Sequence, residues 1–277
     1  MTPQAHRLSG NRLHLQHGPI DLVIGADENC EVAYRYAHER FQSVLEELVA
    51  ELPRLRSPVG APLKGRTACR MARAVEPHTE FITPMAAVAG AVADEVIAAM
   101  RMAEPSRAYV NNGGDIAVHV SPGAVYRLAI ADHLGQRLGQ IEIRHGDGIG
   151  GVATSGRHGR SLSMGIADSV TVLARNAAMA DAAATLIANA VDLPGHTAIL
   201  RAPAQELDPD SDLGSRPIVT GVGPLSEAEI AEALDRGCHA AKRMQARGLI
   251  VAGALFLAGE TRTVGAALPQ IRNVEHA

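Results

Sequence analysis

Two side chains in an alanine-rich stretch have the types and spacing of a small divalent-cation site. Asp181 and Thr185 lie four residues apart, so a helix would carry the carboxylate and the hydroxyl on one face, one turn apart. Hard oxygen ligands of this kind suit Mg²⁺, which keeps several waters and takes few protein ligands. The alternative is an acid exposed near a helix start, where the helix dipole favours it.

Two polar turns supply groups that could bind a small polar ligand. The first reads Asn-Asn-Gly-Gly-Asp over residues 111–115, and the second reads Thr-Ser-Gly over residues 154–156. Adjacent glycines let backbone N–H groups converge on a phosphate or a nucleobase. Both segments are equally typical of plain turns, in which these residue types are common. The candidate ligand-binding residues are Asn112, Gly113, Gly114, Asp115, Thr154, Ser155 and Gly156.

Candidate acid–base groups lie beside these turns. His145 and His158 flank the glycine-rich segment, and no H-x-x-x-H or H-E-x-x-H pair occurs among the histidines. His158 could transfer a proton if it faces the cleft, and Asp115 could act as an acid or a base. We expect Thr154 and Ser155 to bind a ligand rather than to attack one, because the segment lacks the G-x-S-x-G pattern of a nucleophile elbow.

A literal G-x-G-x-x-G occurs at Gly146, Gly148 and Gly151. A dinucleotide-binding fingerprint requires a helix to begin at the last glycine, with its N-terminus at the pyrophosphate. Residues 152–156 instead predict an extended segment and a turn, so the Rossmann interpretation fails. These glycines more simply allow a tight turn or a close approach to a ligand.

Composition excludes several classes of protein. The net charge is −4 and aromatic residues make up 3% of the chain, which argues against a nucleic-acid partner. The three cysteines are far apart, so a disulfide framework or zinc ribbon is not expected, and a reducing cytoplasm is the natural compartment. No signal-peptide core occurs at the amino terminus, and the longest apolar run, residues 249–258, falls short of the about 20 residues that span a bilayer. We therefore expect a cytoplasmic protein without a membrane partner.

The hydrophobic pattern predicts a mixed fold. Thr83 and Ser226 are placed to cap helices, and residues 203–217 form an acidic, turn-rich loop. These signals predict one α+β domain over residues 1–277, with a mostly antiparallel sheet packed with helices. The expected helices cover 31–52, 85–102 and 227–245, and the expected hairpins cover 12–24 and 249–264. Further strands are expected near 109–110, 116–120, 125–131, 140–144, 169–174 and 197–202. Of these, 125–131 and 140–144 are expected to be antiparallel neighbours.

Four short motifs in a fixed order resemble the ApbE superfamily, whose best-known members are FAD:protein FMN transferases. The motifs are Asn-Gly-Gly-Asp (112–115), Ala-Thr-Ser-Gly (153–156), Ser-Val-Thr-Val (169–172) and Ala-Asp-Ala-Ala-Ala-Thr (180–185). The resemblance covers about the central third of the chain. It implies a T-fold-like α+β arrangement, Mg²⁺ at Asp181 and Thr185 with a backbone carbonyl near 86–87, and a flavin-nucleotide site at the two turns. It also implies a homo-oligomer, since T-fold relatives commonly close a barrel between subunits.

The chain departs from the transferases at two places. Residues 84–95 contain no lysine where those enzymes carry one, and the interval 157–168 has no His-Ile-x-Asp-Pro-x-x-Gly segment. These departures indicate a short branch in which FMN transfer is lost or replaced. The sequence predicts an enzyme that binds a flavin-like, nucleotide-like or other small polar metabolite with Mg²⁺. Two alternatives stay open: a hydrolase or isomerase that uses acid–base chemistry on the same scaffold, and a ligand-binding protein without catalysis.

Overall fold

The computed structural model describes residues 2–58, 60, 62–131 and 137–266. The chain forms two compact units, and it passes between them several times. The first unit is made of Met1–Tyr126, Glu142–Ala153 and Ala174–Ala182, and the second of Arg127–Ile141, Thr154–Leu173 and Ala183–Ala277. One domain over residues 1–277 stays a prediction. Within the described ranges, no helix combines the length and the hydropathy needed to cross a membrane.

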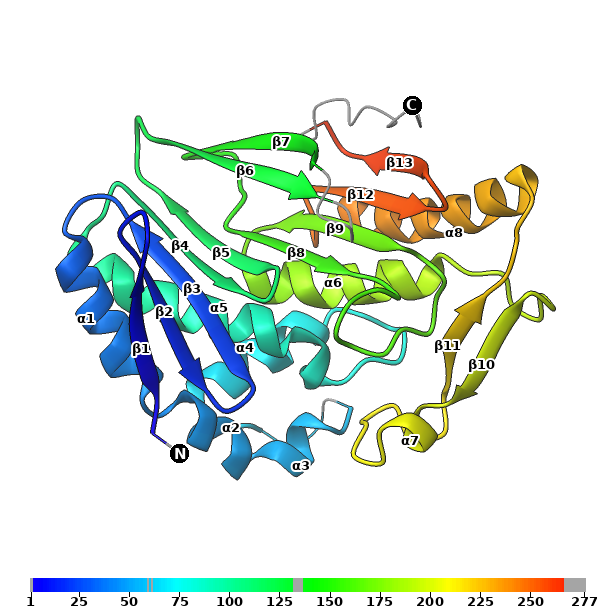
Figure 1. Cartoon of the computed structure of the whole chain (residues 1–277), viewed down its shortest axis with the longest axis horizontal. Coiled ribbons are helices and arrows are strands. Elements are labelled where there is room, and N and C mark those ends of the chain that lie inside the picture. Colours follow the sequence, from blue (N-terminus) through cyan, green and yellow to red (C-terminus); the bar gives the residue numbers. More distant parts are fainter. Residues whose placement is uncertain (1, 59, 61, 132–136, 267–277) are drawn as a thin grey trace. The chain divides into compact units, whose positions relative to one another are not determined.

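The sheet of the first unit is antiparallel. Its described strands are hydrogen-bonded in the order β1-β2-β3-β4-β5-β8, and Figure 1 shows β1 to β5 side by side. The predicted hairpin over 12–24 is confirmed, because β2 and β3 are paired antiparallel, with Leu13 opposite Ile24 at one end and His17 opposite Ile20 at the other. The bounds are Gln4–Leu8 for β1, Arg12–His17 for β2, Ile20–Ala26 for β3, Arg107–Asn112 for β4, Asp115–Val120 for β5 and Gly151–Ser155 for β8.

Helix α5 (Val88–Met100) is the central helix of the first unit. It packs on β4 and β5 and is also in contact with α1 and α4, so residues 90–97 are all buried. The short 3₁₀ helix η1 (Pro84–Ala87) precedes it, and the Thr83 side chain accepts the Met85 N–H at 3.3 Å, which confirms Thr83 as a cap. A second 3₁₀ turn, η2 (Arg101–Ala103), follows it.

Two glycines allow the start of α6 (Ala177–Ala190) to be approached very closely. A Cβ atom at Gly90 of α5 would lie 2.3 Å from the carbonyl oxygen of Ala177. A Cβ atom at Gly151 of β8 would lie 2.1 Å from the amide nitrogen of the same residue. Any larger residue would collide with backbone at either position, so glycine is required for this packing.

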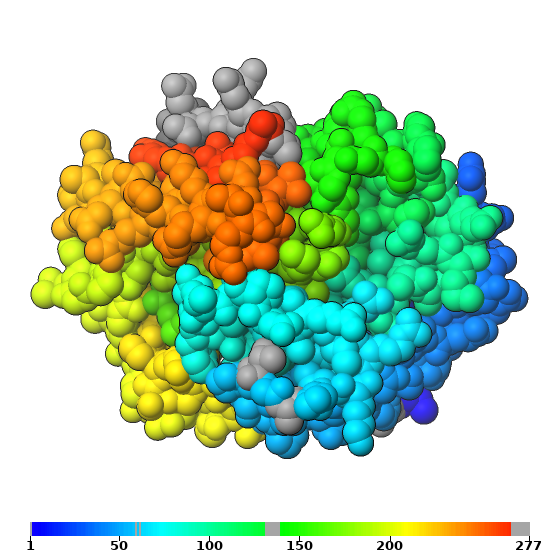
Figure 2. Space-filling model, turned by 180° about the vertical axis from the view of Figure 1, so that it is seen from behind, coloured from blue at the N-terminus to red at the C-terminus, as the bar shows by residue number. Residues whose placement is uncertain are grey.

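The single helix predicted over 31–52 is wrong, because the segment forms three helices. The break falls at Ser43, whose hydroxyl donates to Glu47 Oε1 at 2.7 Å and accepts from Arg40 at 3.0 Å. Serine side chains that bond locally compete with the continuous helix ladder. Figure 2 shows the blue-to-cyan residues of this part of the chain in the lower part of the face that it views. The bounds are Cys30–Phe41 for α1, Val44–Ala50 for α2, Leu52–Leu55 for α3 and Arg66–Val75 for α4.

The second unit contains two smaller antiparallel arrangements. β9 pairs with β12 and β12 with β13, while β10 and β11 form a separate hairpin. Every residue of β9 and β12 is buried, and α8 packs on β12 and β13. The predicted closing hairpin is confirmed. The bounds are Ser169–Ala174 for β9, Ile199–Pro203 for β10, Pro217–Val222 for β11, Ala252–Leu257 for β12 and Glu260–Val264 for β13.

Helix α8 (Glu227–Ala246) begins with a complete capping box. The Ser226 hydroxyl accepts the Glu229 N–H, and the Glu229 carboxylate accepts the Ser226 N–H at 2.7 Å, so the predicted cap is confirmed. The loop expected over 203–217 instead contains a short helix, α7 (Ala204–Leu207). β6 (Val125–Ala131) and β7 (Arg137–Arg144) form a two-stranded sheet, so the two segments are neighbours as expected, and residues 132–136 between them lie outside the described residues.

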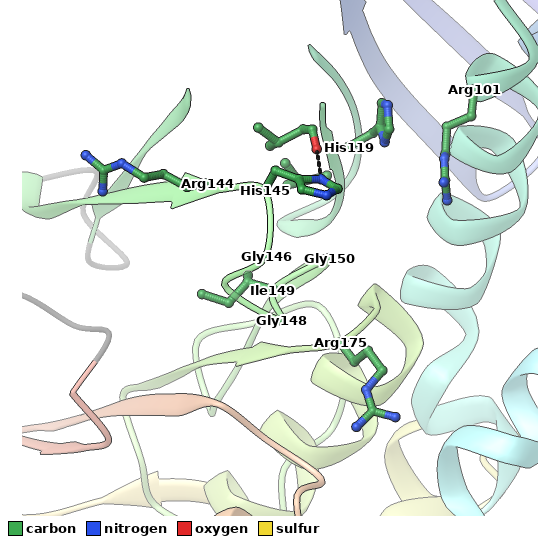
Figure 3. Close-up of a pocket in the computed structure, with 11 residues that line it drawn as sticks. Arg101, His119, Arg144, His145, Gly146, Gly148, Ile149, Gly150 and Arg175 are labelled. Carbon is green, nitrogen blue, oxygen red and sulfur yellow. Dashed lines mark hydrogen bonds between the residues drawn. The ribbon is translucent and has the colours of Figure 1, made fainter. Parts of the chain in front are cut away.

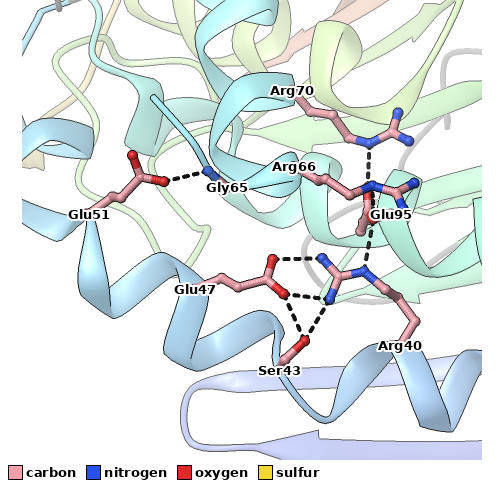
Figure 4. A network of polar contacts seen from close by, with 8 residues as sticks. All are labelled: Arg40, Ser43, Glu47, Glu51, Gly65, Arg66, Arg70 and Glu95. Atoms are coloured by element: carbon pink, nitrogen blue, oxygen red, sulfur yellow. Dashed lines mark hydrogen bonds and ion pairs between the residues drawn. The ribbon is translucent and has the colours of Figure 1, made fainter. Parts of the chain in front are cut away.

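A buried carboxylate joins the helices of the first unit. The Glu95 side chain is fully buried, and its two oxygens accept hydrogen bonds from Arg40 Nε at 2.8 Å and Arg70 Nε at 2.7 Å (Figure 4). Arg66 Nε lies 3.1 Å from the same carboxylate. Burial opposes ionisation of Glu95, but the hydrogen bonds from Arg40 and Arg70 outweigh it and lower the pKa. Glu95 is therefore a shared anion for α1, α4 and α5.

Replacing Glu95 by Gln should destabilise the protein by about 3–5 kcal/mol, because the buried carboxylate charge shared by Arg40, Arg66 and Arg70 is lost, although Arg40 keeps its contact with Glu47. The free energy of unfolding at neutral pH, measured by chemical denaturation, checks this. The matched control is Glu39→Gln on the exposed face of α1, which should change the unfolding free energy by no more than about 0.5 kcal/mol. Equal stability of the two variants would contradict this role for Glu95.

The neighbouring Asp94 fixes the start of α6. Its two carboxylate oxygens accept the N–H groups of Ala177 and Ala178 at 3.0 and 2.9 Å, which satisfies two donors that a helix start leaves without intrahelical partners. The carboxyl is almost completely buried, and burial raises its pKa to about 6, although the two N–H bonds favour the charged form.

The raised pKa of Asp94 should make stability depend on pH. The native state binds this proton more tightly than the unfolded chain, so the free energy of unfolding should fall by about 3 kcal/mol as the pH rises from 4 through 6. In Asp94→Asn this contribution is absent, so the stability difference between wild type and variant should shrink across that window. Chemical denaturation at several pH values measures it, with Asp235→Asn on α8 as the control that should follow the wild type. A constant difference between wild type and Asp94→Asn would refute the assignment.

Candidate functional site

The predicted residues Asp181 and Asn112 both bind the first turn of α5. The Gly90 N–H donates to Asp181 Oδ2 at 3.0 Å, and the Asn112 side-chain amide donates to the Ala89 carbonyl at 3.1 Å. The Gly90 N–H and the Ala89 carbonyl are neighbours in the first turn of α5, so the Asp181 carboxylate of α6 and the Asn112 amide at the end of β4 meet there. Asn112 is buried and Asp181 is half-buried.

The Gly113–Gly114 pair closes the tight turn between β4 and β5. Both residues have positive φ, at 65° and 112°, which glycine adopts without strain. The Gly114 N–H donates to the Asn111 side-chain oxygen at 2.9 Å. No atom would lie within 4 Å of a Cβ at Gly114, so the turn borders open space there. The turn therefore brings Asp115 back beside Asn112, to which it is directly paired.

Two carboxylates influence each other at this point. Burial raises the pKa of Asp181 well above its ordinary range, and the negative charge of Asp115 acts in the same direction. Hydrogen bonds from Gly90 and Ala89 oppose the shift. A pair of acidic side chains held this way is stabilised by a proton or by a cation. We call Asn112, Asp115, Asp181 and the Ala89–Gly90 backbone the acidic cluster.

The donor set of the acidic cluster suits a hard divalent cation. Across the described residues, no group of three or more His, Cys, Asp or Glu side chains is arranged to hold a metal ion. A cation at Asp181 and Asp115 would therefore need carbonyl, hydroxyl or water ligands as well, which is the usual situation of Mg²⁺. Thr185 lies one turn further along α6 and is half-buried.

The Thr-Ser-Gly turn lies in the second unit. The Thr154 and Thr171 hydroxyls are 2.9 Å apart, which ties the end of β8 to β9. Gly156 has a φ of 147°, and a Cβ there would lie 2.6 Å from the Asp168 carbonyl oxygen. Glycine is thus needed at this turn for packing, whatever it binds. Ser155 is half-buried.

His158 is paired with an acid that the sequence interpretation did not select. Its Nε2 lies 3.2 Å from Asp168 Oδ1, and the same oxygen accepts two bonds from the Arg157 guanidinium at 2.9 and 2.6 Å. The other Asp168 oxygen accepts the Ala258 N–H at 2.6 Å. The Asp168 side chain is only 12% exposed. A signal was present in the sequence, since Asp168 directly precedes the buried strand β9.

The structure thus groups some predicted site residues and leaves others untested. Asn112, Gly113, Gly114, Asp115 and Asp181 lie together in the first unit, and Thr154, Ser155, Gly156 and His158 are close in sequence within the second. Convergence of the two sets on one ligand stays a prediction.

Comparison with known proteins finds similar chains among curated proteins named UPF0280. A UPF0280 protein of Methanopyrus kandleri is 41% identical over 180 residues, which cover 61% of this chain and 69% of that protein. A UPF0280 protein of Methanothrix thermoacetophila is 42% identical over 111 residues, 40% of this chain and 46% of its own length. Several of these matches span less than half of the curated relative.

Solved structures of low sequence identity were also matched. The flavin transferase ApbE from Vibrio cholerae is 13% identical with a TM-score of 0.49, and the match covers 95% of this chain and 98% of that one. The flavinyl transferase ApbE of Pseudomonas stutzeri in its apo form is 12% identical with a TM-score of 0.47, over 100% and 99% of the two chains.

The family model described as AbpE bacteria matches residues 4–263, which is most of the chain. The match agrees with the order of motifs in the sequence and with the α+β fold and its large antiparallel sheet. The protein therefore belongs to the AbpE bacteria family of the ApbE-like superfamily.

Proposed function

We propose that this protein binds a flavin- or nucleotide-like metabolite through its phosphate groups at the acidic cluster, together with Mg²⁺. The observation that carries the proposal is the Asp181 carboxylate, which accepts the Gly90 N–H at the first turn of α5 and whose pKa is raised by burial and by the charge of Asp115. Two adjacent carboxylates favour a cation between them, and a cation there favours an anionic ligand. Family membership and the order of the motifs support the flavin-like class of ligand.

Different residues of the cluster would bind the cation and the ligand. Asp181 and Asp115 would hold the cation, and Thr185 is a third candidate ligand from the resemblance. When bound, Mg²⁺ would neutralise negative charge on a pyrophosphate. Gly113 and Gly114 would present backbone N–H groups to the ligand where the turn borders open space. Thr154, Ser155 and Gly156 are proposed as further ligand-binding residues.

FMN transfer to a protein is not part of this proposal. Residues 84–95 carry no lysine, and the interval 157–168 is short. A homo-oligomer, the T-fold arrangement and a cytoplasmic location remain proposals from the resemblance and the composition. Light scattering of the purified protein would measure the first of these directly.

A second candidate function rests on the His158–Asp168 pair. Asp168 fixes the orientation of the imidazole, which is the arrangement that positions a histidine for proton transfer. In that case the protein would convert a small metabolite by acid–base chemistry, and the cation would be dispensable. Cleavage of FAD to FMN and AMP that persists in excess chelator, and is lost in His158→Gln, would favour this candidate over the first.

Replacing Asp181 by Asn should weaken Mg²⁺-dependent binding of FAD by about tenfold or more, because one of the two carboxylates is lost. Flavin fluorescence and calorimetry with and without Mg²⁺ give the two affinities. The control Asp235→Asn removes an exposed helical carboxylate on α8 and should bind like the wild type. Equal affinity of Asp181→Asn and wild type, or no effect of Mg²⁺ on either, would remove the proposal.

A further inference from the structure

A cavity of about 350 Å³ opens in the first unit, at the end of β5 away from Asp115. Its lining residues come from β5, from the segment that runs from the last residue of β7 to β8, from the first residue of η2, and from the link between β9 and α6 (Figure 3). Its volume lies in the range of small-molecule pockets. The lining residues best suited to contact a polar ligand are Arg101, His119, His145, Gly148 and Arg175.

The wall of the cavity carries positive charge in a protein of net negative charge. Three arginines and two histidines line it, and the lining includes no carboxylate. The whole chain has a net charge of −4. Arg144 is neutralised by Glu142 at 2.5 Å, and Figure 3 shows its side chain extending away from His145. Within the described ranges, neither Arg101 nor Arg175 has an ion-pair or hydrogen-bond partner for its guanidinium.

The histidines of the cavity are held in place by backbone and hydroxyl groups. His145 Nδ1 donates to the Val120 carbonyl at 3.1 Å, since a carbonyl can only accept, and this leaves Nε2 as the other polar atom of the ring (Figure 3). His119 Nε2 lies 3.3 Å from the Ser121 hydroxyl. Burial lowers the pKa of His119, and the positive charge of Arg101 lowers it further, which places that charge near the ring.

The glycines of the G-x-G-x-x-G segment form the remaining wall. Gly146 and Gly148 have φ of 94° and 73°, and no atom would lie within 4 Å of a Cβ at either position. At Gly150, by contrast, a Cβ would lie 2.4 Å from the Arg175 carbonyl oxygen. The Gly150 N–H donates to the Ala174 carbonyl at 3.0 Å, and its own carbonyl accepts the Val118 N–H at 2.9 Å. The loop, β5 and the residues before α6 are thus fixed to one another.

We propose that this cavity binds a small oxyanion, a phosphate group or a carboxylate, through Arg101 and Arg175, with His119 and His145 as additional hydrogen-bonding groups. Guanidinium groups bind both kinds of oxyanion with paired N–H donors. The open glycine backbone lets the ligand approach the chain closely. This site is separate from the acidic cluster, because the cluster lies at the first residue of β5 and the cavity at its last three.

Calorimetric titration with inorganic phosphate and with succinate, at constant ionic strength and in excess chelator, tests the proposal. Wild type should bind at least one of them with a Kd below about 10 mM. The double variant Arg101→Gln/Arg175→Gln should bind that anion about tenfold more weakly or worse. Binding of phosphate alone would identify a phosphate site, binding of succinate alone a carboxylate site, and binding of both a general oxyanion site.

Two controls separate this site from other effects. Arg73→Gln removes an exposed guanidinium on α4, away from the cavity lining, and should bind the anion like the wild type. Asp181→Asn should also bind it unchanged, so failure at the acidic cluster and failure here are distinguishable. Thermal unfolding shows whether the double variant is folded. No measurable binding to wild type, or equal binding by the folded double variant, would overturn the proposal.

Discussion

The first unit depends on the way buried carboxylates around α5 are neutralised. Asp94 and Glu95 are adjacent in the most buried helix of the unit, and each is satisfied by different donors. Asp94 accepts two N–H groups at the start of α6, whereas Glu95 accepts guanidinium groups from α1 and α4. A buried charge without such partners would cost several kcal/mol. The helices are therefore positioned by polar contacts as much as by their apolar faces.

The acidic cluster is a third polar contact made by α5, after those of Asp94 and Glu95. Asp181 of α6 accepts the N–H of Gly90, which lies in α5 one turn before Asp94. Asp94 of α5 in turn accepts the Ala177 N–H at the start of α6, so each helix carries a carboxylate that binds the backbone of the other. They differ in their surroundings. Asp94 is nearly inaccessible, whereas Asp181 is half-buried and faces the charge of Asp115. Asp94 is thus suited to structure and Asp181 to binding.

The elements with strong local signals could be predicted from the sequence. Ser226 followed by Glu229 marks a helix start, and the alternation in residues 12–24 marks a hairpin; both were found where predicted. Helix α4 was missed although its signal was present, since Ala68, Met71, Ala74 and Val75 recur at helical spacing and are buried. Strand β1 was missed because all its residues are exposed, so no period of two is visible.

The candidate site was predictable in its residue types but not in its partners. The proximity of Asn112 to Asp181 could be expected only through the resemblance, because their link passes through the backbone of Ala89 and Gly90, which no side-chain pattern reports. The role of Asp168 was unpredictable for a related reason, because its carboxylate is bound by the Ala258 N–H, ninety residues away. The resemblance likewise gave no sign of the arginine-lined cavity, since Arg101 and Arg175 belong to none of its motifs.

The contacts of Gly90 and Gly151 with Ala177 have a mechanical consequence. Backbone meets backbone on two sides of this residue, so no side chain is present there that could change rotamer and absorb a displacement. The close contacts therefore fix the start of α6 sterically, and Asp181 lies one turn further along the same helix.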